Sequence, residues 1–309
     1  MWGRSDGGPS VVWRMADGGE PTLLMFATLR TYLEMIRFSH TVFALPFALM
    51  GAVLAAGGIP SADKLLWIVV AMVGARSGAM GVNRLADRSL DARNPRTQQR
   101  ALPQGRIAPA EALVFVIASF GIFVWAAFRL NPLCFALAPV AILILAGYSY
   151  TKRFTALSHC ILGLSLGLAP VGAWIAVTGH LAPPPLVLGG AVLFWVAGFD
   201  VLYALLDIEF DRNTGLFSVP ARLGPRGGLF VARLFHGLTL IGLALLIPML
   251  RLGPVYAAGL FLASALLIYQ HVLLHRHGLA KVEVACFNVN AVLSIGMFLS
   301  ALGDLLLQR

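Results

Sequence analysis

The sequence predicts an all-α, polytopic membrane protein that folds as a bundle of about nine transmembrane helices. Its composition supports this fold class, because 59% of the 309 residues are hydrophobic and only 12% are charged. The mean hydropathy of +0.82 lies far outside the range of soluble globular domains. A third observation is a series of apolar runs, each long enough to approach the thickness of a bilayer.

Nine runs come close to the roughly 20 apolar residues that a helix needs to cross a hydrocarbon core about 30 Å thick. In chain order they are Phe38–Gly57, Leu65–Val82, Ala112–Ala127, Leu133–Tyr150, Cys160–Thr178, Pro185–Leu206, Leu229–Leu250, Pro254–Leu274 and Ala285–Leu307. Three of the runs contain Pro46, Pro139 or Pro170, so we expect the ends to shift by a few residues and the count by one.

The Lys and Arg residues divide unevenly between the two sets of loops that nine spans create. One set contains Arg84, Arg88, Arg93, Arg96, Arg100, Arg106, Lys152, Arg153, Arg212, Arg222, Arg226, Arg276 and Lys281. The other set contains Lys64, Arg129, Arg251 and the terminal Arg309. Because cytoplasmic loops carry the excess of basic residues, the N-terminus and the basic loops are predicted to be cytoplasmic. The pI of about 10.1 therefore indicates topology, and with no soluble basic domain we expect no nucleic-acid partner.

The chain before the first span is predicted to be a disordered N-terminal tail, residues 1–29, followed by one membrane domain, residues 30–309. From Met1 to about Pro21 the sequence is rich in glycine and mixed in charge. It has no apolar run ahead of a small-residue cleavage site, so we interpret it as a tail rather than a signal peptide.

The second span runs into a polar motif, "GVNRLADRSLDARNPRT" (Gly81–Thr97). Asn83, Asp87 and Asp91 are spaced four residues apart, which keeps all three on one face of a helix. Arg76 lies two turns earlier on the same face, nominally inside the membrane, where an ionisable residue suggests function. A membrane-edge helix with solvated charges would explain this motif equally well if it stood alone.

A second acidic motif, "DVLYALLDIEFDR", ends the sixth span. Its Asp200, Asp207 and Asp211 are spaced i, i+7 and i+11, again on one helical face, with Tyr203 between them. The predicted topology places both motifs on the cytoplasmic side of the membrane, where they can converge on one site.

Carboxylates gathered at a membrane edge repel one another unless they hold cations. Ligands that are all oxygen, without His or Cys, favour a hard ion. Mg²⁺ typically binds through a few carboxylates together with waters and substrate phosphates. The two motifs therefore indicate Mg²⁺, and Mg²⁺ indicates a substrate that carries phosphate.

Basic residues beside the motifs fit such a substrate. Arg96 and Arg100 follow the first motif, and "GYSYTKRF" places Tyr148, Lys152 and Arg153 at the cytoplasmic end of the fourth span. Any one of these cations could serve topology alone, but together with the aspartates they are typical of a diphosphate clamp. An apolar tail on the same substrate would lie between the membrane helices.

These motifs resemble the UbiA superfamily of intramembrane aromatic prenyltransferases. The resemblance rests on NxxxDxxxD and DxxYxxxDxxxD, on "NPRTQQRALPQG" (Asn94–Gly105) and on "YSYTKRF", and it covers about Tyr32 to Leu307. The segments "RFSHTVFALPFAL", "SHCILGLSLGLAPVGAWIAVTG" and "PARLG" are most similar to the bacterial branch of 4-hydroxybenzoate polyprenyltransferases and their menaquinone-pathway relatives. Many members have Asp directly after the motif asparagine; Arg84 stands there in this chain, which removes one possible ligand and favours that branch.

The resemblance implies a Mg²⁺-dependent transfer of a polyprenyl group from polyprenyl diphosphate to an aromatic acid, in the inner membrane of a bacterium. An allylic carbocation would be attacked by the aromatic ring ortho to its hydroxyl group. The residues implied for metal and diphosphate are Asn83, Asp87, Asp91, Asp207 and Asp211, with Asp200 as a further substrate-binding residue. The implied diphosphate clamp is Arg96, Arg100, Lys152 and Arg153.

Four other residues receive roles on the same basis. Arg76 would pair with the carboxylate of the aromatic acid, and Tyr148 and Tyr203 would shield the carbocation with their ring faces. His40, at the head of the first span, would line the substrate entrance, although an interfacial histidine is more often simply hydrated.

The residues leave several alternatives open. The acceptor is expected to be 4-hydroxybenzoate, with a naphthoate of menaquinone biosynthesis as the alternative. A membrane transporter would also carry ionisable residues within its spans, but more often near the bilayer midplane. A CDP-alcohol phosphotransferase would show a DGxxAR-type run, which the sequence lacks. The prenyl chain length and the oligomeric state remain open.

Overall fold

The computed structural model describes residues 31–36, 41–278, 282 and 284–308. Every regular element among these residues is helical, which confirms the predicted all-α class. The elements are α2 (Thr41–Ala56), α3 (Ala62–Arg93), α4 (Pro109–Leu130), α5 (Pro132–Thr151), α6 (Ser158–Thr178), α7 (Pro183–Ala204), the 3₁₀ turn η2 (Leu205–Asp207), α8 (Ile208–Thr214), α9 (Val219–Leu250), α10 (Pro254–His277), the π-helical turn η4 (Val284–Asn288) and α11 (Val289–Leu307).

Within the described residues, eight helices are long and apolar enough to cross a membrane. They are Ala62–Arg93, Pro109–Leu130, Pro132–Thr151, Ser158–Thr178, Pro183–Thr214, Val219–Leu250, Pro254–His277 and Cys286–Leu307. Helix α2 contributes a shorter apolar stretch, Ala44–Ala56. Together they agree with the predicted bundle of about nine spans. The start of the first predicted span at Phe38 and the predicted tail, residues 1–29, lie outside the described residues.

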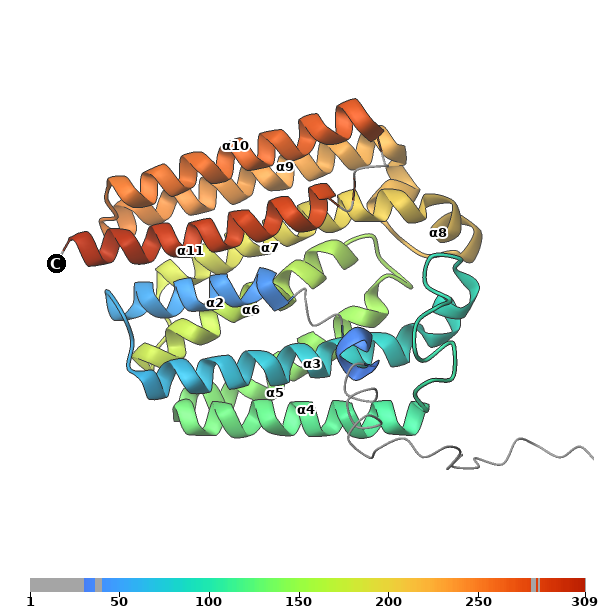
Figure 1. Cartoon of the computed structure of the whole chain (residues 1–309), viewed down its shortest axis with the longest axis horizontal. Coiled ribbons are helices and arrows are strands. Elements are labelled where there is room, and N and C mark those ends of the chain that lie inside the picture. The colour runs from blue at the N-terminus through green and yellow to red at the C-terminus, as the bar shows by residue number, and fades with distance from the viewer. Residues whose placement is uncertain (1–30, 37–40, 279–281, 283, 309) are drawn as a thin grey trace, which may run out of the picture.

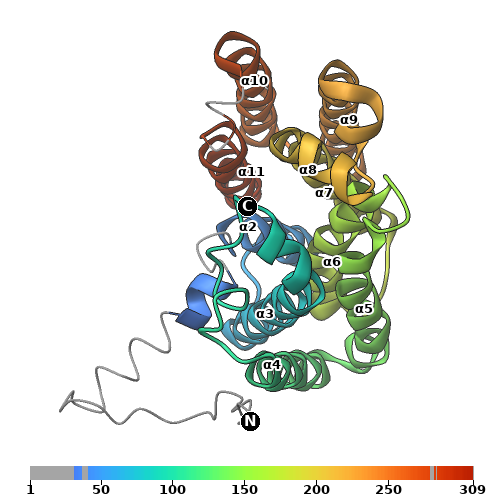
Figure 2. The same cartoon turned by 90° about the vertical axis from the view of Figure 1, so that its right-hand side faces the viewer.

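The long helices lie side by side in one bundle, and α8 lies at one end of it (Figure 1). We call this the motif end, defined by residues 83–106 and 200–218, because both sequence motifs lie there. Helix α3 packs on α4, α6 on α7, α7 on α9 and α10 on α11. Viewed from the motif end, α2 lies among α3, α6 and α11, each of which it contacts (Figure 2).

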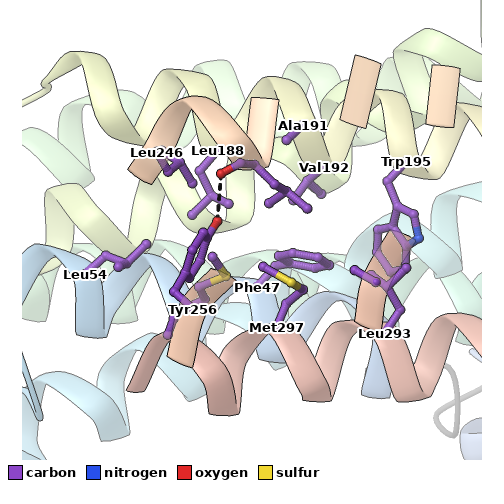
Figure 3. Packing of buried hydrophobic residues seen from close by; sticks show 14 of the residues in the cluster. Phe47, Leu54, Leu188, Ala191, Val192, Trp195, Leu246, Tyr256, Leu293 and Met297 are labelled. Atoms are coloured by element: carbon purple, nitrogen blue, oxygen red, sulfur yellow. Dashed lines mark hydrogen bonds between the residues drawn. The ribbon is translucent and has the colours of Figure 1, made fainter. Parts of the chain in front are cut away.

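The largest buried cluster joins α2, α7, α9, α10 and α11 (Figure 3). Phe47 of α2 packs against Trp195 of α7 with the two rings tilted and their centroids 4.9 Å apart. The hydroxyl of Tyr256 donates a hydrogen bond to the carbonyl of Leu243 at 2.9 Å. Lipid supplies little hydrophobic force between helices, so close packing and such interhelical hydrogen bonds hold the bundle together.

Helices α6 and α7 cross with their backbones almost in contact. A Cβ atom added at Gly167 of α6 would lie only 2.5 Å from the carbonyl oxygen of Gly189 on α7. Gly163, one turn earlier, is pressed equally closely against the carbonyl of Leu193. Small residues at these positions therefore let α6 and α7 approach, as in other membrane helix pairs, and fix their register.

Candidate active site

The motif end contains a polar pocket of about 290 Å³. Its polar and charged lining residues are Asn83, Arg84, Asp87, Asp91, Asn94, Arg96, Thr97, Arg100, Tyr148, Lys152, Asp200, Tyr203, Asp207 and Asp211. The structure thus brings both sequence motifs to one site, as expected from their predicted positions on the same side of the membrane. The roles assigned to the individual residues stay predictions.

Helix α3 supplies the first group of acidic side chains. It continues for 32 residues, longer than the roughly 20 that cross a membrane, so its last turns reach the motif end. Asp87 and Asp91 lie one turn apart on the face turned into the protein, and they are only 2% and 6% exposed. A carboxylate buried this deeply requires a partner of opposite charge.

Asp87 finds such partners in the α5–α6 connection. The ammonium of Lys152 lies 2.5 Å from its Oδ2 atom, and a guanidinium nitrogen of Arg153 lies 3.3 Å from its Oδ1 atom. The amide nitrogen of Asn83 also donates to Oδ2 at 3.1 Å. Arg153 does not line the pocket, but it donates in addition to the carbonyls of Ala86 and Ser149. Lys152 and Arg153, two of the four predicted clamp cations, thus both reach the first motif.

Asp91 is paired with two arginines. Arg100 contacts both of its carboxylate oxygens, at 2.7 and 2.8 Å. Arg84 approaches to 3.8 Å, and it also donates to the side-chain oxygen of Asn83 and to the carbonyl of Met35. Arg84 is buried. The residue directly after the motif asparagine is therefore an internal cation of the site.

Asp207 is held by a fork of hydrogen bonds. The Nε and one terminal nitrogen of Arg96 contact its two oxygens at 3.1 and 2.5 Å, and the amide of Asn94 donates at 3.1 Å. The other terminal nitrogen of Arg96 donates to the hydroxyl of Tyr203, whose ring the guanidinium also covers at 5.0 Å. Burial alone would lower the pKa of Arg96, but the hydrogen bonds and charge of Asp207 raise it above its ordinary value. Arg96 therefore stays protonated at any working pH.

The spacing of the second acidic motif predicted one continuous α-helical face, and this prediction is wrong. Helix α7 ends at Ala204, and the 3₁₀ turn η2 separates it from α8. Asp207 has φ −113° and ψ 11°, which lies outside the helical region. Because a 3₁₀ turn has fewer residues per turn than an α-helix, it rotates Asp207 and Asp211 relative to Asp200. All three nevertheless line the polar pocket.

Asp200 has a different kind of partner. Its Oδ2 atom lies 2.6 Å from the Nδ1 atom of His159, a buried residue in the first turn of α6. Sequence reasoning did not select His159, Arg84 or Asn94. The signal that could have revealed Arg84 is its position seven residues before Asp91, two turns away on the same helical face.

An apolar cavity of about 270 Å³ adjoins the polar pocket. Side chains of α3, α4, α5 and α6 line it, and Arg76 lies among them. Met80, Tyr148 and Leu162 line both spaces, so the polar pocket and the apolar cavity meet there. The structure thus separates Arg76 from the acidic motifs and places Tyr148 at the junction. His40 lies outside the described residues.

The polar pocket suits a hard metal ion that is shared with a ligand. Within the described residues, no three His, Cys, Asp or Glu side chains lie close enough together to hold a metal by themselves. Mg²⁺ does not need such a cage, because it usually takes one or two carboxylates and completes its shell with waters and phosphate oxygens. The oxygen-only acidic groups of the pocket meet that requirement.

Both the sequence and the fold are similar to those of known proteins of one family. The sequence matches the UbiA prenyltransferase family over residues 44–300. A 4-hydroxybenzoate octaprenyltransferase from Nitrosospira multiformis is 33% identical over 244 residues, which cover 79% of this chain and 84% of the relative. The apo structure of a UbiA homolog from Aeropyrum pernix K1 is 31% identical with a TM-score of 0.79, covering 86% of this chain and 98% of that one. A UbiA homolog from Archaeoglobus fulgidus bound to DMAPP and Mg²⁺ is 20% identical with a TM-score of 0.66, covering 88% and 99%, and shares the fold.

Proposed function

Since the chain belongs to the UbiA prenyltransferase family and is a prenyltransferase embedded in the membrane, we propose that it transfers a polyprenyl group from polyprenyl diphosphate to 4-hydroxybenzoate. The observation that carries this proposal is the junction between a charged pocket and an apolar cavity. The charged pocket suits the diphosphate, and the apolar cavity suits the reacting end of the prenyl chain and the aromatic ring. The reaction would take place where the two spaces meet.

The basic side chains of the polar pocket would bind the diphosphate. Lys152, Arg96 and Arg100 each contact a motif aspartate. When the diphosphate arrives together with a cation, the basic groups can turn to phosphate oxygens while the carboxylates turn to the metal. Each charge then exchanges one partner for another of the same sign, so none is left unpaired in a buried site.

We assign Asn83, Asp87, Asp91, Asp207 and Asp211 as the groups that would hold Mg²⁺. When bound, this ion neutralises the charge that develops on the departing diphosphate. The guanidinium and ammonium groups of the clamp act on the same oxygens, since they are positioned before the reaction begins and need little reorganisation.

The reaction breaks the bond between the terminal prenyl carbon and the diphosphate oxygen. The diphosphate leaves with the bonding electrons, a new bond joins that carbon to the ring carbon ortho to the hydroxyl, and the ring gives its proton to the released diphosphate. Tyr148, at the junction, can face the allylic cation with its ring. One face of Tyr203 is covered by Arg96 and would become free for the cation when Arg96 moves to the diphosphate.

Arg76 would select the acceptor. A guanidinium among apolar side chains is suited to bind a carboxylate, because the two groups form a pair of parallel hydrogen bonds and their attraction is stronger in a low dielectric. The carboxylate of 4-hydroxybenzoate bound to Arg76 would leave its hydroxyl end nearer Tyr148. We also propose that the motif end faces the cytoplasm of a bacterial cell, because the basic loops gather there.

The test is prenyl transfer by the purified protein in lipid, with Mg²⁺ and a long-chain prenyl diphosphate. 4-Hydroxybenzoate and 1,4-dihydroxy-6-naphthoate are offered in parallel, and products are identified by mass spectrometry. We expect product with the benzoate, lost on adding EDTA. Product with the naphthoate alone would move the enzyme to menaquinone synthesis, and no product with either would refute the assigned acceptor class.

Two substitutions test the site itself. Asp87→Ala and Asp207→Ala should each abolish turnover while the protein remains folded in the membrane. Asp63→Ala is the matched control, because Asp63 lies on the same helix as Asp87 but at the opposite end, exposed and bonded to Trp67. Activity retained by either motif variant would remove that aspartate from the site.

A further inference from the structure

The pairing of His159 with Asp200 differs from the ion pairs that hold three other carboxylates of the polar pocket. Asp87, Asp91 and Asp207 are each held by Lys or Arg. Asp200 is instead held by an imidazole that is itself only 4% exposed. The chemistry of that imidazole is determined by its second contact.

The hydrogen bonds of His159 define which of its nitrogens carries the proton. The backbone N–H of Val219, at the start of α9, donates to the Nε2 atom of His159 at 3.2 Å. A backbone N–H can only donate, so Nε2 must offer a lone pair. The proton therefore lies on Nδ1 and is donated to Asp200 at 2.6 Å. In this tautomer the imidazole is neutral.

His159 is rigidly placed between three helices. The close crossing of α6 and α7 fixes the helix that carries His159 against the helix that carries Asp200. The chain before α9 is tied down as well, because the N–H of Phe217 donates to the carbonyl of Lys152 at 2.7 Å. The carboxylate of Asp200 thus has a fixed donor on one side, while its side chain remains 30% exposed toward the polar pocket.

We propose that His159 is a positioning residue that presents Asp200, with its negative charge intact, as a further anionic oxygen ligand for the metal–diphosphate complex. A Lys or Arg partner would orient the carboxylate but would also cancel its charge, and it would have to leave before a metal could bind. A neutral imidazole orients the carboxylate without competing for it. This inference rests on the proposed function and assigns a part of that site which the sequence did not reveal.

Two near-isosteric substitutions separate the two hydrogen bonds of His159. In His159→Asn the amide nitrogen can occupy the place of Nδ1 and still donate to Asp200. In His159→Gln the amide reaches the place of Nε2, where its oxygen can accept from Val219, but the donor to Asp200 is lost. If His159 acts through Asp200, the Asn variant should bind the metal complex nearly as well as the unaltered protein, and the Gln variant should bind it more weakly.

The readout is binding rather than turnover. The Mn²⁺ complex of a prenyl thiolodiphosphate, which resists cleavage, is titrated into protein in lipid nanodiscs and followed by electron paramagnetic resonance against empty nanodiscs. We expect His159→Gln to raise the dissociation constant about tenfold, as for loss of one hydrogen bond to a charged group, and His159→Asn to stay within about threefold. In an Asp200→Ala background, His159→Gln should have no further effect. Melting midpoints are measured for each variant as the folding control.

Two outcomes would overturn the role of His159 alone. The first is a His159→Asn variant that binds the complex as weakly as His159→Gln. The second is a loss caused by His159→Gln that persists undiminished in the Asp200→Ala background, since a merely structural effect would not depend on Asp200. Failure of the unaltered protein to bind the Mn²⁺ complex would overturn the proposed function together with this inference.

Discussion

The structure predicts that lysine cannot replace Arg96 without a large loss of activity, although the charge is kept. The guanidinium of Arg96 makes three side-chain hydrogen bonds, two to Asp207 and one to the hydroxyl of Tyr203. A lysine ammonium is a point charge without the planar fork, so it can satisfy one of these acceptors well but not all three. The same fork is what a diphosphate would meet.

In the proposed complex the fork of Arg96 turns to the diphosphate, so the magnitude follows from the two hydrogen bonds to phosphate oxygens that Arg96→Lys would remove. Bonds to charged groups contribute about 1.5–3 kcal/mol when buried, but the side chain of Arg96 is 30% exposed. We therefore assign about 1 kcal/mol to each bond, which gives about 2 kcal/mol in total. That energy corresponds to a loss of roughly 30-fold in kcat/KM for the prenyl diphosphate.

The assay is release of diphosphate in nanodiscs at a saturating concentration of acceptor, with the prenyl diphosphate varied. Arg93→Lys is the matched control, because Arg93 lies three residues away and is exposed, and among the described residues it donates only to the carbonyl of Ser89 in its own helix. We expect the KM for the aromatic acceptor to be unchanged. The reasoning about the fork would be refuted if Arg96→Lys and Arg93→Lys had the same small effect.

Three further changes have defined outcomes. Asp304→Ala should lower the melting midpoint by an amount equivalent to about 2–4 kcal/mol, because this buried carboxylate accepts hydrogen bonds from the first backbone N–H groups of α10. Gln308→Ala removes only one donor to Asp304 and should lower the midpoint less; equal effects of the two variants would contradict the capping role. Gly167→Ala should destabilise the α6–α7 crossing by about 1–3 kcal/mol, whereas Gly190→Ala, where nothing lies within 4 Å of the new Cβ, should be nearly neutral; equal melting midpoints would contradict the close approach. Arg76→Gln should raise the KM for the benzoate acceptor with little change in the KM for the prenyl diphosphate, and steady-state kinetics showing the reverse would place Arg76 on the diphosphate instead.

The fold class could be predicted from the sequence because bilayer thickness imposes a length on apolar runs. The same constraint does not fix helix ends, and α3 continues to Arg93 well beyond the apolar part of its span. The meeting of the two acidic motifs was predictable as well, since both lie at the ends of spans on the same side of the membrane. What joins them in space, the pair of Arg96 and Asp207, links residues 111 positions apart and has no local signal.

The residues that sequence reasoning missed share a physical cause. His159 lies at the start of an apolar span, where a histidine is usually interpreted as a packed or hydrated side chain. Only the three-dimensional crossing of α6, α7 and α9 gives it two hydrogen-bond partners. The 3₁₀ turn at η2 was equally hidden, because the spacing of Asp200, Asp207 and Asp211 is compatible with an unbroken helix.

The ion pairs of the polar pocket also bear on the net charge of the site before substrate binds. Among the residues that the structure describes, five carboxylates line the pocket, and five basic side chains line it or contact its carboxylates. They are Asp87, Asp91, Asp200, Asp207 and Asp211, against Arg84, Arg96, Arg100, Lys152 and Arg153. The formal charges of these side chains therefore cancel. A bare diphosphate would bring uncompensated negative charge to the membrane edge, whereas a diphosphate already neutralised by metal would not. The enzyme should consequently discriminate by charge balance, accepting the metal complex as one unit and rejecting either component alone.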